Sequence, residues 1–198
     1  SQLFMVIFGL DSNSFVAYDS NIVRSDGDIH YIAGIKENSK QVAAISSSII
    51  QLIYKRVGTA AASVSNRNTS VSHQEVLNFT QQHSDILDIP NKANEWRKTI
   101  GDISVRHLGA YYFLFKHLIS ENKADEFFSI YADGTGEGVT KDHPIVLLRN
   151  KLAKDKDKRL THLERMAYLV LAWNNFIQGN LSMEFLRLTK SKKKDHSG

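Results

Sequence analysis

Hydrophobic residues recur along most of this chain at the spacing of amphipathic helices. From residue 38 the apolar side chains follow the i, i+3, i+4, i+7 rule, with Val42, Ile45 and Ile49 among them. This spacing places them on one face of a helix. Gly58 is typical of a helix end. The pattern therefore predicts a helix over about 38–57 with one buried face.

Capping signals mark two further helix starts. Ser72 with Glu75, and Thr161 with Glu164, have the S/T-x-x-E spacing in which the two side chains bond each other's exposed backbone amides. Gly179 stands where a helix C-terminus requires a left-handed residue. The second signal and this glycine predict a last long helix that runs to about residue 178.

The middle of the chain carries a run that is apolar almost all round. Residues 105–119, VRHLGAYYFLFKHLI, predict a central helix that packs on several sides. Shorter helices are expected within 92–100, after a break at Pro90, within 124–132, and from Pro144 onward. Six or seven helices are expected in all.

The first 37 residues have a different pattern. Short β-rich runs such as FMVIFGL and FVAYD alternate with turn residues, which is typical of strands. We therefore predict a mainly α, multi-helix globular domain with a small N-terminal β element. The expected boundaries are a β and turn segment over 1–37, a helical domain over 38–189 and a basic disordered tail over 190–198.

Composition fits one globular domain. Of the 198 residues, 42% are hydrophobic, which is enough to fill a core, and 23% are charged. There are no cysteines, which excludes disulfides and thiolate metal sites and fits a cytoplasmic location. No signal peptide or membrane span is predicted. Because the chain starts with Ser1 and an apolar run, we expect it to be part of a longer protein.

Positive charge gathers toward the C-terminal end. The net charge is +4, and residues 141–198 hold 13 Lys and Arg against 6 Asp and Glu. Such a local surplus is expected of a protein that binds a polyanion, although lysine-rich tails also serve solubility. The predicted nucleic-acid contacts are Arg149, Lys151, Lys154, Lys156, Lys158, Arg159, Arg165, Arg187, Lys190, Lys192, Lys193 and Lys194.

Other candidate chemistry has a structural interpretation. His107 and His117 lie ten residues apart within the central helix and have no H-x3-H partner, so we predict no metal site and no cofactor. The glycine-rich loop DGTGEG follows a helix and lacks the lysine of a phosphate loop. The aromatic run at 111–115 is expected in the core, and the neighbouring acids Asp125 and Glu126 at the surface.

Several spaced motifs resemble one protein family. Pro144, Ile145, Leu148, Arg149 and Leu152 match a "pI..LR..L" helix, and Ala172, Trp173, Asn174 and Gly179 match a "kAWN.y..G" helix. EVLNFTQQHSDIL and ADEFFSIYADGTG also have counterparts. Together they resemble the helical C-terminal region that follows ParB and sulfiredoxin-like nuclease domains in proteins of phages, plasmids and mobile elements.

The resemblance implies what is missing as well as what is present. The segment GLDSNSFVAYDSNIVRSDGDIHYIAGIKENSKQVAAI, with Asp19 and Arg24, is similar to the exit from the ParB-like domain. The family's "DGQHR" motif has no counterpart, since the chain contains no G-x-H-R. The resemblance thus implies that any catalytic half lies upstream, and that this chain is not an enzyme.

Two functions follow as hypotheses. The first is a non-catalytic, DNA-associated module that contacts phosphates through its basic C-terminal surface. The alternative is a protein-interaction or self-association module, in which a stripe of Leu181, Phe185 and Leu188 meets a partner or a second copy.

Overall fold

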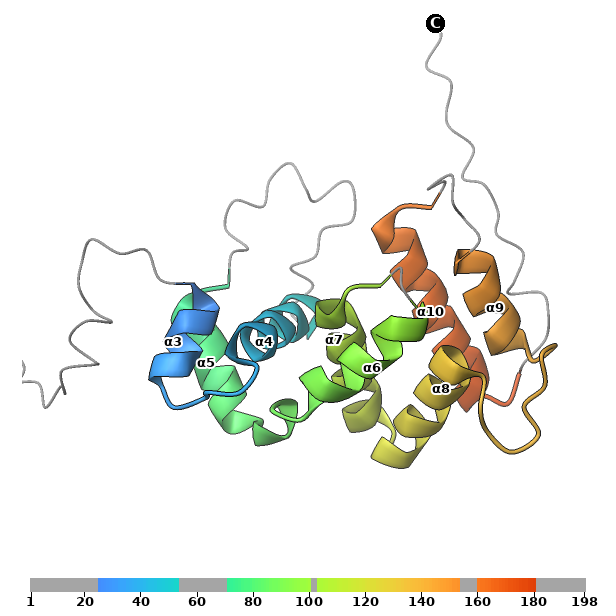
Figure 1. The fold of residues 1–198 in the computed structure, drawn as a ribbon, viewed down its shortest axis with the longest axis horizontal. Helices are drawn as coiled ribbons and strands as arrows, with labels where there is room; N and C mark the ends of the chain where they lie inside the picture. Colours follow the sequence, from blue (N-terminus) through green and yellow to red (C-terminus); the bar gives the residue numbers. More distant parts are fainter. Residues whose placement is uncertain (1–24, 54–70, 101–102, 154–159, 181–198) are drawn as a thin grey trace, which may run out of the picture.

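The fold is mainly helical. The computed structural model describes residues 25–53, 71–100, 103–153 and 160–180. These form eight α-helices and one short 3-10 helix, η1 (Figure 1). Their bounds are α3 Asp26–Ile32, α4 Ser39–Ile53, α5 His73–Gln82, η1 Ser84–Ile86, α6 Ile89–Ile100, α7 Val105–Leu118, α8 Glu121–Asp133, α9 Pro144–Ala153 and α10 His162–Ile177. Within these ranges no residue forms a strand.

Helix α3 corrects the prediction for the N-terminal segment. Residues 26–32 were assigned to the β and turn segment, and they are helical. The Ser25 side chain accepts from the backbone N–H of Asp28, and the Asp28 carboxylate accepts from the Ser25 N–H. This capping box uses Asp where the usual signature has Glu or Gln, so the pattern missed it. Residues 33–37 of the predicted segment form turns and irregular structure, and residues 1–24 lie outside the described residues.

The other predicted helix signals act as expected. Ser72 with Glu75 and Thr161 with Glu164 form reciprocal capping boxes at α5 and α10. Gly179 has φ 65°, the left-handed conformation that ends α10.

The prediction of a break at Pro90 is wrong, because Pro90 is the second residue of α6. A proline is tolerated there because the first helical N–H groups have no intrahelical acceptor.

Helix α7 is the centre of the fold. It packs against α4, α6 and α8, and Figure 1 shows it between α3, α4 and α5 at one end of the molecule and α8, α9 and α10 at the other. Tyr112, Phe113 and Phe115 are buried, as the sequence predicts. The ring of Phe115 stacks on that of Trp173 in α10, with centroids 4.3 Å apart. Aromatic burial thus links α7 to the C-terminal helices.

A glycine sets the distance between α7 and α4. Gly109 is buried in the middle of α7. A Cβ there would lie 2.6 Å from Cδ1 of Ile45 and 3.1 Å from Cγ2 of Ile89. Both isoleucines belong to the core, so neither has open space to move into. The absence of a side chain at residue 109 lets the two helices approach closely.

A Gly109→Val variant tests this contact. We expect it to lower the free energy of unfolding by about 2–3 kcal/mol, because overpacking a dense core forces neighbours off their preferred rotamers. Urea denaturation measures the change. Ala167→Val on the exposed side of α10 is the matched control, and we expect it to cost about 0.5 kcal/mol from helix propensity alone. Equal losses in the two variants would contradict a tight α4–α7 contact.

A buried polar network joins the three N-terminal helices. His30 of α3 is fully buried, and its Nδ1 donates to the Asp26 carbonyl over 2.7 Å. Its Nε2 lies 2.9 Å from the hydroxyl of Thr80 in α5. That hydroxyl lies 2.7 Å from the hydroxyl of Ser46 in α4. Burial lowers the pKa of His30, although the carbonyl bond and the Asp26 charge act in the opposite direction. The imidazole is therefore held neutral.

This pKa shift predicts how stability depends on pH. The unfolded chain takes up a proton on His30 at a higher pH than the folded chain, so the stabilisation is present above about pH 6.5 and is lost as the pH falls below it. The slope from one such group is at most about 1.4 kcal/mol per pH unit. Urea denaturation between pH 5 and 8 measures it. A His30→Gln variant should show a shallower slope; an unchanged slope would place the titrating group elsewhere.

No helix in the described ranges combines the length and the apolar character needed to cross a membrane.

Candidate nucleic-acid interface

Three of the predicted phosphate-contacting residues lie in the described part of the chain. Arg149 and Lys151 belong to α9, and Arg165 belongs to α10. The others lie outside the described residues: Lys154, Lys156, Lys158, Arg159, Arg187, Lys190, Lys192, Lys193 and Lys194. Lys151 is exposed, whereas both arginines make bonds to the protein's own backbone.

Arg149 closes the end of the preceding helix. Its Nη1 donates to the carbonyl of Ala132, in the last turn of α8, and its Nε and Nη2 donate to the side chain of Asn150. The last carbonyls of a helix have no intrahelical donor and carry a partial negative charge. The guanidinium of Arg149 satisfies one of them, while Gly134 with φ 69° caps the same end.

Arg165 does the same for the next helix. Only 8% of it is exposed, and its Nη1 donates to the carbonyl of Leu152 in α9 over 2.9 Å. The C-terminal carbonyls of α8 and α9 therefore each accept from an arginine on the following helix. For Arg149 and Arg165 a phosphate would have to compete with these bonds, and their contact with DNA stays a prediction.

Replacing Arg165 tests whether its bond to the Leu152 carbonyl stabilises the fold. We expect Arg165→Gln to lower the free energy of unfolding by about 1–3 kcal/mol, because a buried carbonyl loses its charged donor. Thermal or urea unfolding measures this loss. Lys141→Gln is the matched control at an exposed turn position, where we expect a change within about 0.5 kcal/mol. A stable Arg165→Gln protein would show that the Leu152 carbonyl finds another donor.

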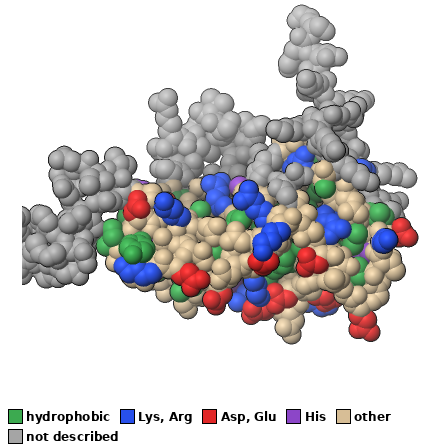
Figure 2. Space-filling model, viewed as in Figure 1, with side chains coloured by type: hydrophobic (Ala, Val, Ile, Leu, Met, Phe, Trp, Pro, Cys, Tyr) green, Lys and Arg blue, Asp and Glu red, His purple; other side chains and the backbone are tan. Residues whose placement is uncertain are grey.

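Other basic side chains gather over α6 and α7. Figure 2 shows Lys and Arg across the middle of one face and most of the visible Asp and Glu along its lower edge. Arg97 and Lys98 lie in the last turn of α6, and Arg106 lies in the first turn of α7. The connection between these two packed helices is short, so both ends lie together. We did not predict these residues, although the R-K pair before the G-D-I-S turn and Arg106 after it were a signal.

The lysines of this region are paired with carboxylates, whereas the two arginines are not paired with any described carboxylate. Lys98 pairs with Glu95 over 2.6 Å and Lys92 with Asp125 over 2.9 Å. Arg97 and Arg106 are exposed, and neither has a carboxylate partner among the described residues. Among the described residues, the Arg106 guanidinium has the ring of His107 as its neighbour, with Nη2 and Nε2 3.4 Å apart. Within the part of the chain that the structure describes, no carboxylate competes with an external anion for either guanidinium group.

The helical body itself is close to neutral. The described residues hold 12 Lys and Arg against 14 Asp and Glu, whereas the whole chain has 25 against 21. The net positive charge of the protein thus comes from segments outside the described residues. Within the body, the positive region in the middle of the face in Figure 2 therefore results from how the charges are distributed and not from a net surplus.

The two neighbouring acids of α8 have separate partners. Asp125 accepts from the hydroxyl of Tyr112 over 2.8 Å and pairs with Lys92, while Glu126 pairs with Lys123. Burial raises the pKa of Tyr112, and the hydrogen bond to the Asp125 carboxylate raises it further. The Tyr112 hydroxyl therefore stays protonated and donates. This network joins α6, α7 and α8 at the surface.

Comparison with family models, with curated proteins and with solved structures found no match for this chain. The resemblance to ParB-like proteins accordingly rests on the motifs in the sequence alone.

Proposed function

We propose that this protein is a non-catalytic, DNA-associated helical module. The observation that supports the proposal best is the pair of exposed guanidinium groups, Arg97 and Arg106, at the adjoining ends of α6 and α7. Arg97 lies in the last turn of α6 and Arg106 in the first turn of α7, and these two helices pack on each other. The partial positive charge of the α7 N-terminus has the same sign. The predicted basic residues of 154–159 and 187–194, which lie outside the described residues, would add further phosphate contacts.

Such a surface binds DNA without reading its sequence. Each neutralised phosphate releases condensed counterions, so the affinity falls steeply as salt rises. Arginine suits this role because its planar fork donates two parallel bonds to phosphate oxygens. The proposed interaction therefore positions the protein on the duplex backbone, and base recognition is not part of it.

Charge reversal at the arginine pair tests this function. We expect an Arg97→Glu, Arg106→Glu double variant to bind a labelled DNA duplex at least tenfold more weakly than the wild type at low salt. The slope of log affinity against log salt should fall in magnitude by about two, one unit for each lost phosphate contact. Fluorescence anisotropy at 50 and 200 mM salt measures both quantities.

Two further variants complete the DNA test. Lys123→Glu makes the same kind of charge change at the opposite end of the α7–α8 pair and should bind almost as the wild type does. A Lys156→Glu, Lys158→Glu, Arg159→Glu variant measures the share of the basic connector. Absence of wild-type binding at low salt would reject the proposed function, and equal losses in Lys123→Glu and the arginine variant would reject the arginine pair.

A second candidate function is self-association. Leu118 and Ile119 stand side by side at the end of α7 and are 70% and 51% exposed, and adjoining apolar side chains of this size are common at protein interfaces. The stripe Leu181, Phe185 and Leu188 that carried this hypothesis lies outside the described residues. Light scattering of the protein without DNA distinguishes this function, since a dimer that Leu118→Asp dissociates would favour it.

A further inference from the structure

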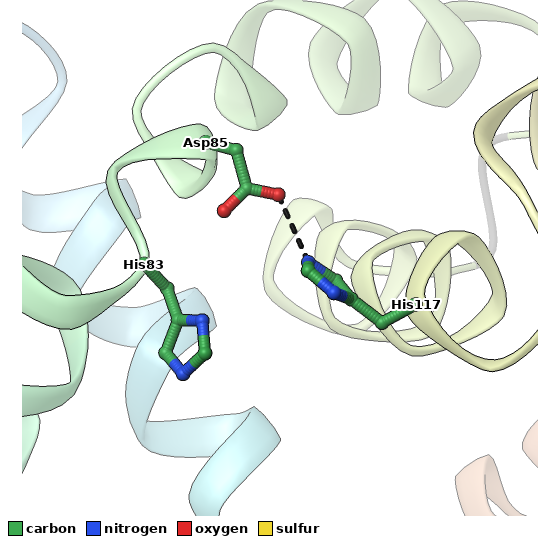
Figure 3. A group of neighbouring side chains, drawn as sticks. All are labelled: His83, Asp85 and His117. Carbon is green, nitrogen blue, oxygen red and sulfur yellow. Dashed lines mark hydrogen bonds and ion pairs between the residues drawn. The ribbon is translucent and has the colours of Figure 1, made fainter.

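Three side chains from neighbouring elements converge on one point beside α7. His83 follows the end of α5, Asp85 belongs to η1 and His117 lies in the last turn of α7. Their nearest ring nitrogens and carboxylate oxygen all lie within 4.8 Å of one another. Figure 3 shows the three groups at the corners of a triangle, with the carboxylate of Asp85 hydrogen-bonded to His117. The distance from Nε2 of His117 to Oδ2 of Asp85 is 3.0 Å.

The backbone beneath two of these residues is fixed. The N–H of His83 donates to the carbonyls of Phe79 and Thr80, and the His83 carbonyl accepts from Ile86. Ile86 is fully buried and anchors η1 in the core. His83 has φ −125° and ψ 69°, outside the helical region. This bend turns the side chains of residues 83 and 85 toward α7, which a continued helix would not do.

An aromatic side chain supports both imidazoles. The ring of Phe113, one turn before His117 in α7, lies 4.2 Å from the His117 ring and 5.4 Å from the His83 ring, centroid to centroid. The ring of Phe79 also packs against His83, with centroids 4.5 Å apart. Phe113 is buried. These contacts restrict the rotation of the rings and so hold their nitrogens near Asp85.

Some nitrogen and oxygen atoms of the three side chains have no hydrogen-bond partner among the described residues and could coordinate an ion. His83 is half-buried, and neither of its ring nitrogens has a hydrogen-bond partner among the described residues. The second carboxylate oxygen of Asp85 lies on the side of His83 (Figure 3). Oδ2 of Asp85 lies 3.0 Å from Nε2 of His117 and 3.2 Å from Nζ of Lys116.

We propose that His83, Asp85 and His117 bind a divalent transition-metal ion, with zinc as the representative case, and leave one coordination position to water. Two imidazoles and one carboxylate are a common ligand set for such ions. A point equidistant from three atoms 4.8 Å apart lies about 2.8 Å from each, and zinc bonds to nitrogen and oxygen are about 2.0–2.2 Å. Inward shifts of under 1 Å close the site.

Lys116 is a neighbouring cation that opposes a bound metal ion. Its Nζ lies 3.2 Å from Oδ2 of Asp85 and 3.2 Å from Oε2 of Glu121. Metal binding places like charges close together, but Lys116 keeps Glu121 as its partner. This arrangement gives the metal site a signature that a plain surface ion-pair network lacks, since removing the Lys116 charge should strengthen metal binding.

The bound ion would join two parts of the chain. His83 and Asp85 belong to the α5–η1 corner, and His117 lies at the end of α7, more than thirty residues later. A ligand that binds only the folded state raises its stability in proportion to the logarithm of the ligand concentration. At saturating zinc we therefore expect the Tm to rise by several degrees.

Zinc titration of the full chain, prepared without a polyhistidine tag and dialysed against a chelator, tests the site. Isothermal titration calorimetry should give one zinc per chain. His83→Ala and His117→Gln should each weaken binding at least tenfold, and Lys116→Gln should strengthen it several-fold. His73→Ala and His107→Ala, which change histidines away from the cluster, are the matched controls and should bind as the wild type does.

Two outcomes would overturn the metal site. One is the absence of zinc binding by the wild-type protein, and the other is equal affinity in the wild type and in the two histidine variants. Circular dichroism of each variant reports whether it is folded, and His117→Gln changes a side chain that is 45% exposed, so a folding defect in His83→Ala alone does not decide the test. The DNA proposal has a separate readout, because neither arginine of that surface belongs to the cluster.

Discussion

The close contact between α7 and α4 is the constraint on which the rest of the fold depends. Gly109 leaves no Cβ between the helices, so Ile45 and Ile89 reach the backbone of α7. Helix α7 can then be covered on several sides, with aromatic side chains on its remaining surfaces. Dense cores transmit small displacements instead of absorbing them. A shift at residue 109 would therefore be felt in every helix that packs on α7.

The same central helix positions both candidate sites. Arg106 lies at its N-terminal end beside α6, and His117 lies at its C-terminal end beside η1. A helix of 14 residues is about 20 Å long, so the two sites are well separated along one rigid element. The positively charged surface and the metal cluster are accordingly independent in their chemistry, although they depend on the same packing.

Local sequence signals predicted most of the helices. They could not predict features that depend on residues brought together by the fold. The capping boxes at Ser72 and Thr161 and the glycine at residue 179 act within a few residues, so the sequence displays them directly. The aspartate variant of the box at Ser25 is less usual, and α3 was missed. His117 was compared with His107 because they share a helix. Its neighbours in space are His83 and Asp85, which no spacing rule connects to it.

In the C-terminal half, two arginines each donate to the C-terminal end of the helix that precedes their own. The last carbonyls of α8 accept from Arg149 on α9, and those of α9 accept from Arg165 on α10. Each helix is therefore completed by the one that is synthesised after it. A chain that ended before α10 would therefore leave the Leu152 carbonyl of α9 without the guanidinium of Arg165.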